Sequence, residues 1–276
     1  MFHGCIVGTG RVRYVRMIII KTPQELELMR ESNRMVAEAL YELQKLVAEG
    51  ITTEELDQLA EDFIRRRGAS PAFKGYRGFP ASLCVSINEE IVHGIPSRRK
   101  LHAGDIVSID MGVLLNGFYG DAAITVAVGS TSPRVQKLLQ VTEASLYRGI
   151  EKAIVGNRLL DISKAIQATV EADGFSVVRD FVGHGIGKKL HEDPQIPNFY
   201  SPTAPNPRLQ EGMVLALEPM VNEGTYKMKI LADEWTAVTA DSKLSAHFEH
   251  TIAITRNGPW ILSSLDNKKA SLPLAG

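Results

Sequence analysis

The sequence predicts an α+β fold in which two related lobes share one sheet. Two pairs of helix signals occur at equivalent places in the two halves of the chain, each pair is followed by strand-like runs, and no Ser-, Gly- or Pro-rich linker separates the halves. We therefore expect one domain over residues 17–262, with lobes at about 17–129 and 130–262. Residues 1–16 are expected to be a flexible N-terminal appendage, and residues 263–276 a C-terminal tail.

The first helix pair is predicted from its capping residues. Thr22-Pro23-Gln24-Glu25 is a capping-box sequence, and leucines and methionines then recur at helical spacing to about Val47. A strand-like run that begins at Met17 leads into this helix. A second capped segment begins at Thr52 and ends before Gly68.

The second helix pair repeats this arrangement. Ser132-Pro133 begins a helix that runs to about Val155, and a further helix runs from about Leu160 to Gly174. In each half, the second helix lies between two glycines with the same spacing, Gly50 and Gly68 or Gly156 and Gly174. Internal duplication explains this match; the alternative is two unrelated helix pairs, which are common.

Six strands are predicted from runs of apolar and β-branched residues. They lie at 83–87, 106–115, 118–128, 176–182, 213–217 and 248–255. The Asn116-Gly117 pair between the second and third runs predicts a two-residue hairpin, which places Asp121 opposite Gly112. Asp110 then lies two residues away on the same face, at a diagonal distance of about 7–8 Å. Two acids on one face of small residues would repel unless a positive charge lies between them.

Two more acids, Glu249 and Glu218, also lie on or directly after predicted strands. Alternation in the last strand puts Glu249 on the face opposite Phe248 and Ile252, away from the bulky side chains. Glu218 ends an apolar strand immediately before a proline, where a carboxylate without a partner is costly. For Glu218 the alternative is an edge carboxylate where the strand emerges, and for Asp110 or Asp121 it is a solvated residue on an exposed face.

Two histidines lie in a glycine-rich segment after a predicted strand. The segment runs from Val182 to Pro194 and contains His184 and His191. Its glycines do not have the dinucleotide-binding spacing, and a proline follows where a phosphate-binding helix should run, so we reject a nucleotide site. Glycines beside His184 instead allow backbone and substrate to approach the imidazole.

Together these residues form a set of metal ligands dominated by oxygen. The set is Asp110, Asp121, His184, Glu218 and Glu249. Four carboxylates and one imidazole suit Mn, Fe, Co or Zn, and argue against a thiolate-rich structural zinc site. Four negative charges balance two divalent ions, which can hold a bridging hydroxide at neutral pH.

Composition excludes several other classes. The 31 basic and 32 acidic side chains give a formal net charge of −1, without the excess of positive charge that nucleic-acid or anionic-membrane binding requires. No apolar run is long enough to cross a bilayer. The two cysteines, Cys5 and Cys84, indicate free thiols in a reducing compartment, so we expect a cytoplasmic protein.

Five ordered motifs of this chain resemble the type I methionine aminopeptidases of the bacterial type, metallopeptidases of family M24 and the pita-bread superfamily. The motifs are SLCVSINEEIVHGIP (82–96), DIVSIDMGVLLNGFYGDAAIT (105–125), GHGIGKKLHEDPQ (183–195), GMVLALEPMV (212–221) and SAHFEHTIAIT (245–255). The resemblance implies a pita-bread fold, with two pseudo-symmetric lobes on a curved antiparallel sheet. This expectation agrees with the duplication derived above.

The resemblance also implies roles for individual residues. It makes Asp110, Asp121, His184, Glu218 and Glu249 the ligands of two metal ions. It makes Glu218 a general base and then an acid, and His93 and His191 substrate-contacting histidines that stabilise the tetrahedral intermediate. The methionine pocket would be formed by Tyr76, Phe79, Cys84 and Trp235. One departure is Leu190, where relatives often carry Phe.

The implied activity is removal of the initiator methionine when the second residue is small, through attack of a metal-held hydroxide on the first peptide bond. The partner would be the N-terminus of a peptide or nascent chain, with ribosome association consistent with that role and a monomer as the family precedent. The alternatives are an Xaa-Pro aminopeptidase or prolidase of the same fold and a non-catalytic binding protein. A type II enzyme is disfavoured because few residues separate Glu218 from Glu249.

Overall fold

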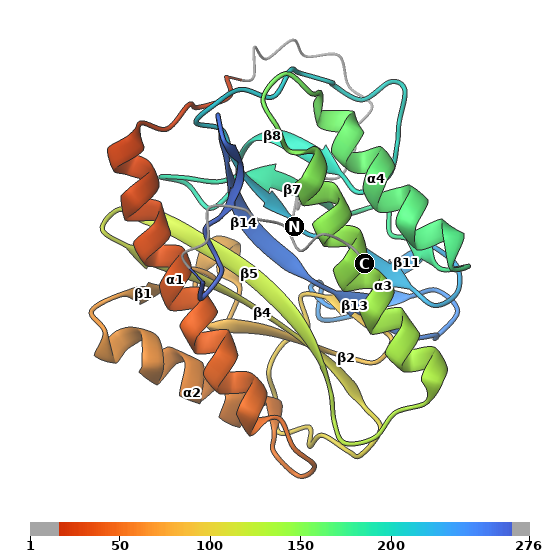
Figure 1. Cartoon of the computed structure of the whole chain (residues 1–276). Coiled ribbons are helices and arrows are strands. Elements are labelled where there is room, and N and C mark those ends of the chain that lie inside the picture. Colours follow the sequence, from red (N-terminus) through yellow and green to blue (C-terminus); the bar gives the residue numbers. More distant parts are fainter. Residues whose placement is uncertain (1–16, 267–276) are drawn as a thin grey trace.

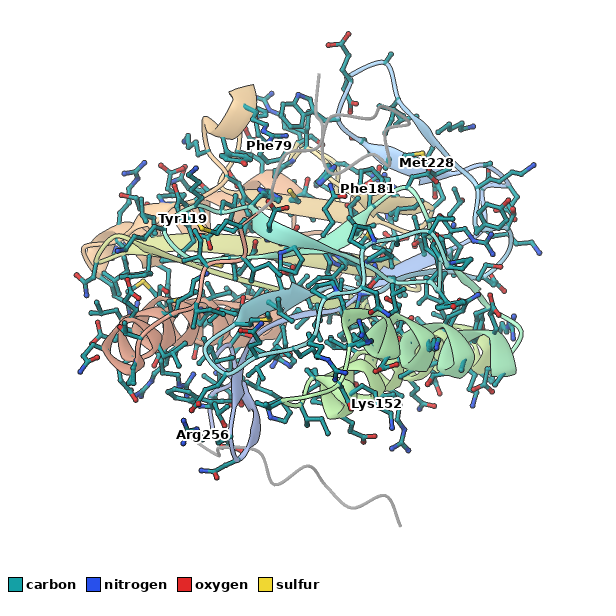
Figure 2. All side chains as sticks on the ribbon, turned by 90° about the horizontal axis from the view of Figure 1, so that it is seen from above. Phe79, Tyr119, Lys152, Phe181, Met228 and Arg256 are labelled. Atoms are coloured by element: carbon teal, nitrogen blue, oxygen red, sulfur yellow. The ribbon has the colours of Figure 1, made fainter. Side chains whose placement is uncertain are left out.

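The computed structural model describes residues 17–266, which form a curved antiparallel sheet with helices packed against one side (Figure 1). Figure 2 shows the helices below the sheet, whereas Phe79, Phe181 and Met228 lie above it. The appendage predicted at 1–16 and most of the tail predicted at 263–276 lie outside the described residues. Among the residues that are described, no helix has the length and apolarity needed to cross a membrane.

The predicted helix pairs are confirmed. They are α1 (Pro23–Leu46), α2 (Thr53–Arg66), α3 (Pro133–Lys152) and α4 (Leu159–Ala172), with a short 3-10 turn η1 (Tyr76–Gly78) between α2 and the sheet. The capping box at α1 is formed, because the Thr22 hydroxyl accepts from the Glu25 amide at 3.2 Å and the Glu25 carboxylate accepts from the Thr22 amide at 3.0 Å. Helix α3 ends before the predicted Val155, since Ala153 leaves the helical conformation with ψ of 56°.

The main sheet joins strands from both halves of the chain. Its order is β1 (Ser70–Pro71), β4 (Ile106–Leu115), β5 (Phe118–Ala127), β14 (Glu249–Thr255), β9 (Val214–Leu217), β7 (Val182–Gly185) and β8 (Glu192–Pro197). In addition, β2 (Leu83–Ile87) pairs with β4 and β15 (Gly258–Ile261) pairs with β14. The contact between β5 and β14 unites the lobes, because Glu249 pairs with Ala123 and His250 with Ala122.

Two small sheets flank the main one. The first has the order β13 (Ser245–His247), β10 (Met220–Asn222), β6 (Ser176–Val177), and the second the order β11 (Met228–Ile230), β12 (Ala237–Thr239), β3 (Glu90–Val92). They explain two corrections to the predicted strands. The run 176–182 is divided between β6 and β7 in different sheets, and Phe248 separates β13 from β14. The strand-like run at Met17 forms no strand.

The predicted hairpin register is confirmed: Leu115 pairs with Phe118 and Gly112 with Asp121. The apolar face of the hairpin packs on the helices as predicted, because Val107, Ile109 and Met111 share one core cluster with Leu40 of α1 and with α2. The acidic residues therefore lie on the opposite face, away from the helices.

Gly120 sets the distance between α1 and β5. A Cβ atom at this position would lie 2.7 Å from the Asn33 amide nitrogen and 2.8 Å from its Cα. The same helix residue fixes the neighbouring strand position, because the Asn33 side-chain oxygen accepts from the Asp121 amide at 3.2 Å. Helix α1 thus holds the backbone that presents Asp121.

We expect Gly120→Ala to lower the free energy of unfolding by about 1–3 kcal/mol, because the methyl group meets helix backbone that cannot rotate away. Urea unfolding followed by circular dichroism measures this change. A variant as stable as the parent protein would show that α1 can move from β5 at little cost.

Candidate active site

Five predicted ligands converge from five places in the main sheet. Asp110 lies on β4, Asp121 on β5, Glu249 on β14 and His184 on β7, and Glu218 follows the last residue of β9. Register explains the convergence, since Asp110 pairs with Ala123, which in turn pairs with Glu249. The site therefore spans the junction of the two lobes.

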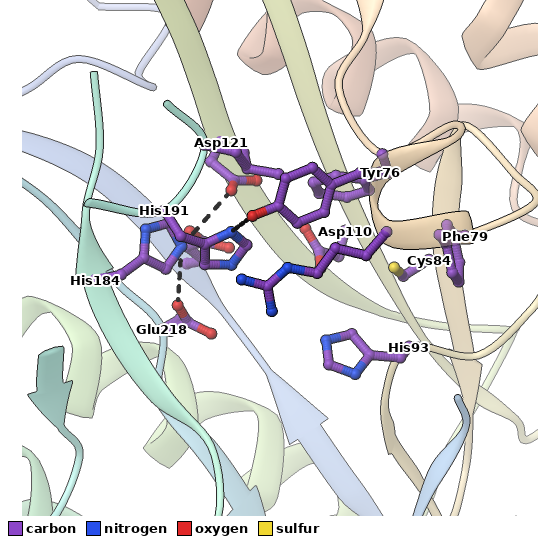
Figure 3. A pocket seen from close by; sticks show the side chains of 13 residues that line it. Tyr76, Phe79, Cys84, His93, Asp110, Asp121, His184, His191 and Glu218 are labelled. Atoms are coloured by element: carbon purple, nitrogen blue, oxygen red, sulfur yellow. Dashed lines mark hydrogen bonds and ion pairs between the residues drawn. The ribbon is translucent and has the colours of Figure 1, made fainter. Parts of the chain in front are cut away.

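The ligand atoms are close together (Figure 3). Nε2 of His184 lies 3.5 Å from Oε1 of Glu218 and 3.9 Å from Oδ2 of Asp121. One ligand atom each from Asp121, His184 and Glu249 lies within 4.8 Å of the other two, and these three side chains are buried. This spacing suits donors arranged around a cation.

The unpartnered atoms of the cluster test whether a metal fits. Oδ1 of Asp110, Oδ1 of Asp121 and Oε1 of Glu249 are buried and have no hydrogen-bond partner among the described residues. Buried polar atoms are nearly always satisfied, so these oxygens lack a positive partner. His184 is also oriented to bind a metal, because its Nδ1 donates to the Gly185 carbonyl oxygen at 2.8 Å. Donation from Nδ1 leaves the Nε2 lone pair free for a metal.

Electrostatics supports the same conclusion. Burial raises the pKa of Asp110 to about 7. Burial, and then the charges of neighbouring carboxylates, raise the pKa values of Asp121, Glu218 and Glu249 well above their ordinary values. Burial lowers the pKa of His184 to about 4, so its imidazole is neutral near pH 7. The residues present therefore fit one or more divalent cations that would neutralise the carboxylates.

One pocket contains the cluster and an apolar wall beside it. The apolar wall consists of Phe73, Tyr76, Phe79, Cys84 and Leu190, and the lining is completed by Arg77, His93, His191 and the five ligands. Trp235, predicted as a pocket residue, packs edge-on against Phe79 of this lining, with ring centroids 5.0 Å apart. Cys84 pairs with Asp110 across β2 and β4, and burial raises the pKa of its thiol well above the ordinary value. The thiol is therefore protonated and serves as an apolar wall.

The two predicted histidines lie on different walls of this pocket. His191 Nδ1 lies 2.9 Å from the Tyr76 hydroxyl, and its ring centroid lies 4.2 Å from that of His184. Burial, and then nearby His184 and Arg77, lower the pKa of His191 to about 2. His93 follows β3 with φ of 62°, and its ring packs edge-on against Phe181. Burial lowers the pKa of His93 to about 4, so both imidazoles are neutral near pH 7.

Sequence reasoning missed two lining residues, Phe73 and Arg77. Phe73 packs where a Cβ of Gly112 would lie, 2.7 Å from the Phe73 ring, so Gly112 leaves space for this wall. Arg77 has φ of 51° and lies between Gly75 and Gly78, which both have positive φ. The two glycines around Arg77 were the signal of an unusual turn, but a turn alone does not indicate a pocket.

A carboxylate on α2 fastens the pocket loop to the helix layer. Glu61 accepts from Lys74 Nζ at 2.7 Å, from Arg65 at 2.7 Å and from the Ser82 hydroxyl at 2.9 Å. The neighbouring Asp57 accepts from the Ser82 amide at 2.8 Å. Lys74 and Ser82 bracket the segment that carries Tyr76 and Phe79.

We expect Glu61→Gln to destabilise the protein by about 1–2 kcal/mol at pH 6–7, with the partners' exposure limiting the effect. The hydrogen bond from Lys74 is the main cause that lowers the pKa of Glu61, from 4.5 to about 2. Because the folded pKa is depressed, the stabilisation is present above pH 4.5 and is lost as the pH falls towards 2. Urea unfolding at several pH values measures the difference, and a difference independent of pH would contradict the assignment.

The fold and the site define a metallopeptidase. The model of metallopeptidase family M24 matches residues 27–256, and the chain belongs to this family. A methionine aminopeptidase of Clostridium perfringens is 58% identical over 90% of this chain and 99% of its own length. The structure of a methionine aminopeptidase from Thermotoga maritima is 48% identical, with a TM-score of 0.87, over 90% of this chain and all of that one. Within the family, the chain is one of the methionine aminopeptidases.

The alternative class shares only the fold. A prolidase from Pyrococcus horikoshii has a TM-score of 0.74 at 22% identity, and the alignment covers 91% of this chain but 65% of that one. Identity at this level establishes the pita-bread fold and carries no argument about substrate. The fold prediction is thereby confirmed, and the methionine aminopeptidases are favoured over the prolidases.

Proposed function

We propose that this protein removes an N-terminal methionine from peptides and nascent chains whose second residue is small, using two divalent ions of Mn, Fe, Co or Zn. The observation that carries the proposal is the convergence of buried, unpartnered carboxylate oxygens in a pocket that also has an apolar wall. The proposed ligands are Asp110, Asp121, His184, Glu218 and Glu249. The high identity to methionine aminopeptidases supports the choice of substrate.

The bound ions would polarise the carbonyl of the first peptide bond and activate water for attack. The chain's own residues transfer the proton and stabilise the oxyanion. Glu218, at the edge of the cluster beside His184, takes a proton from the attacking water and returns it to the leaving amine. His191 and His93, both neutral, donate hydrogen bonds to the developing oxyanion.

The pocket selects the first side chain. Phe79 and Cys84 are buried, and Tyr76 is partly buried against His191. A thioether packs favourably against aromatic rings, and the protonated thiol presents no charge. Trp235 packs edge-on against Phe79. Leu190 contributes an aliphatic side chain to the lining, where relatives often carry Phe.

We further propose that residues 17–262 act as one catalytic domain and that the protein works as a monomer in the cytoplasm. The pairing of β5 with β14 supports a single domain, since each lobe supplies ligands. The low cysteine content supports a reducing compartment. Contact with the ribosome would bring the site to nascent chains, and co-sedimentation with ribosomes tests that part separately.

The decisive experiment compares Met-Ala-Ser, Met-Lys-Ser and an Xaa-Pro peptide after chelation and reconstitution with one metal at a time. We expect release of methionine from Met-Ala-Ser alone, and no turnover by the chelated protein. Cleavage of the Xaa-Pro peptide alone would favour the prolidase alternative. Full metal loading without turnover of any peptide would favour a binding protein.

A further inference from the structure

The turn between β7 and β8 carries His191 to the pocket. It is anchored to β5, because the Tyr119 amide donates to the Gly187 carbonyl at 2.9 Å. Within the turn, the Lys189 amide donates to Oε1 of Glu192 at 3.2 Å. Glu192 is the next residue after His191, so this hydrogen bond joins the backbone on the two sides of the histidine.

A buried ion pair closes this turn against the segment that precedes α1. Lys21 Nζ lies 2.5 Å from Oε2 of Glu192, and each side chain is only 3% exposed. Lys21 is itself held at both ends. Its Nζ donates to the Ile19 carbonyl at 3.1 Å, and its backbone amide donates to the Gly212 carbonyl at 2.8 Å.

The chain leaves space for this pair. A Cβ atom on Gly187 would lie 2.6 Å from Lys21 Cε and 2.7 Å from Oε1 of Glu192. The glycine thus admits both charged side chains beneath the turn. The two oxygens of Glu192 have different partners, one on a distant segment and one within the turn, so the carboxylate fixes the turn relative to the rest of the fold.

We propose that Lys21 and Glu192 are positioning residues that hold His191 in its catalytic place, an inference that rests on the proposed function. A buried ion pair is a poor source of stability, because desolvation offsets the attraction and apolar replacements are often at least as stable. The ion pair does fix the geometry of the turn. His191 must keep its 2.9 Å contact with the Tyr76 hydroxyl and its place beside His184. The adjacent Glu192 is held by Lys21 through one carboxylate oxygen and by the Lys189 amide through the other.

The test uses Glu192→Gln, which keeps the shape but removes the charge. We expect kcat for Met-Ala-Ser to fall about 10–100-fold, with KM changed far less. The same substitution in a His191→Ala background is expected to cause no further loss of kcat, because the group that it positions is already absent. A merely structural pair would lower activity by the same factor in both backgrounds, and that result would overturn the proposal.

The apolar double variant separates stability from positioning. Lys21→Met with Glu192→Leu is expected to match the thermal midpoint of the parent protein while kcat stays low, because the bond to the Lys189 amide is lost. Recovery of kcat together with the midpoint would overturn the proposal. The matched control is Lys188→Met, which removes an exposed ion pair to Glu25, 3.0 Å long, from the same turn. It should leave kcat unchanged.

A readout without turnover distinguishes this inference from the proposed function. The imidazole NMR signals of His191, assigned by their loss in His191→Ala, are expected to shift in Glu192→Gln while those of the distant His102 stay in place. Unchanged His191 signals would contradict the positioning role even in a protein that cleaves Met-Ala-Ser. An inactive parent protein would contradict the proposed function alone, since the NMR comparison would still decide the role of Glu192.

Discussion

Asp121→Asn is expected to abolish turnover of Met-Ala-Ser, with a loss of kcat/KM of about 10³-fold or more, because a metal centre contributes several kcal/mol of transition-state stabilisation. Asn keeps the shape of Asp121 but removes one of the four carboxylates of the cluster. Peptide cleavage measured with each single metal ion tests this. Turnover within tenfold of the parent protein at full metal content would refute Asp121 as a ligand.

The same substitution is expected to act on stability in the opposite direction. Burial and the charges of Asp110 and Glu218 disfavour the ionised form of Asp121, as its raised pKa shows. A neutral amide relieves that repulsion, so the chelated variant should unfold at a higher temperature than the chelated parent protein. Metal should stabilise the parent protein, by about 2.7 kcal/mol at a free concentration of 100 times Kd, and the variant much less.

Asp57→Asn is the matched control for this prediction. Asp57 is also a carboxylate whose pKa is raised by burial, but it lies on α2, where its Oδ1 accepts from the Ser82 and Leu83 amides. Asn retains an acceptor for both amides, so turnover and metal-induced stabilisation should be kept. Loss of both in this variant would show that neutralising any buried acid disturbs the protein.

The local and periodic features of the fold were predictable from the sequence. The capping box at Thr22 and the Asn116-Gly117 turn act over a few residues, and both are formed as expected. The turn fixed a register, and the register alone put Asp110 and Asp121 on one face. Alternation likewise placed Glu249 away from the helices. These inferences held because side-chain direction in a strand follows from position.

The rest depends on long-range contacts that no short pattern contains. The division of 176–182 between two sheets follows from pairing of β6 with β10, more than forty residues further along the chain. Phe73 and Arg77 reach the pocket because a loop folds over Gly112. Lys21 and Glu192 are 171 residues apart in the chain, and in the sequence each of them has the pattern of an ordinary surface charge.

His191→Ala is expected to lower kcat about 10²–10³-fold, which is the usual cost of removing one donor to an oxyanion, with a smaller change in KM. We propose that the Tyr76 hydroxyl, which lies 2.9 Å from Nδ1 of His191, is the donor of this hydrogen bond. The neutral ring then carries its proton on Nε2, where it can donate to the substrate. Tyr76→Phe should therefore cost about 10–100-fold, because it releases this orientation without removing the ring.

The dependence of this loss on pH distinguishes a neutral donor from a cation. Burial holds the pKa of His191 at about 2, far below the working range, so the ratio of parent to His191→Ala kcat should be the same at pH 6 and pH 8. A ratio that grows as the pH falls would show that the imidazolium is the active form. His102→Ala is the matched control, because His102 is exposed before β4 and lies outside the pocket lining. The kcat of His102→Ala should equal that of the parent protein, which would tie the expected loss to His191.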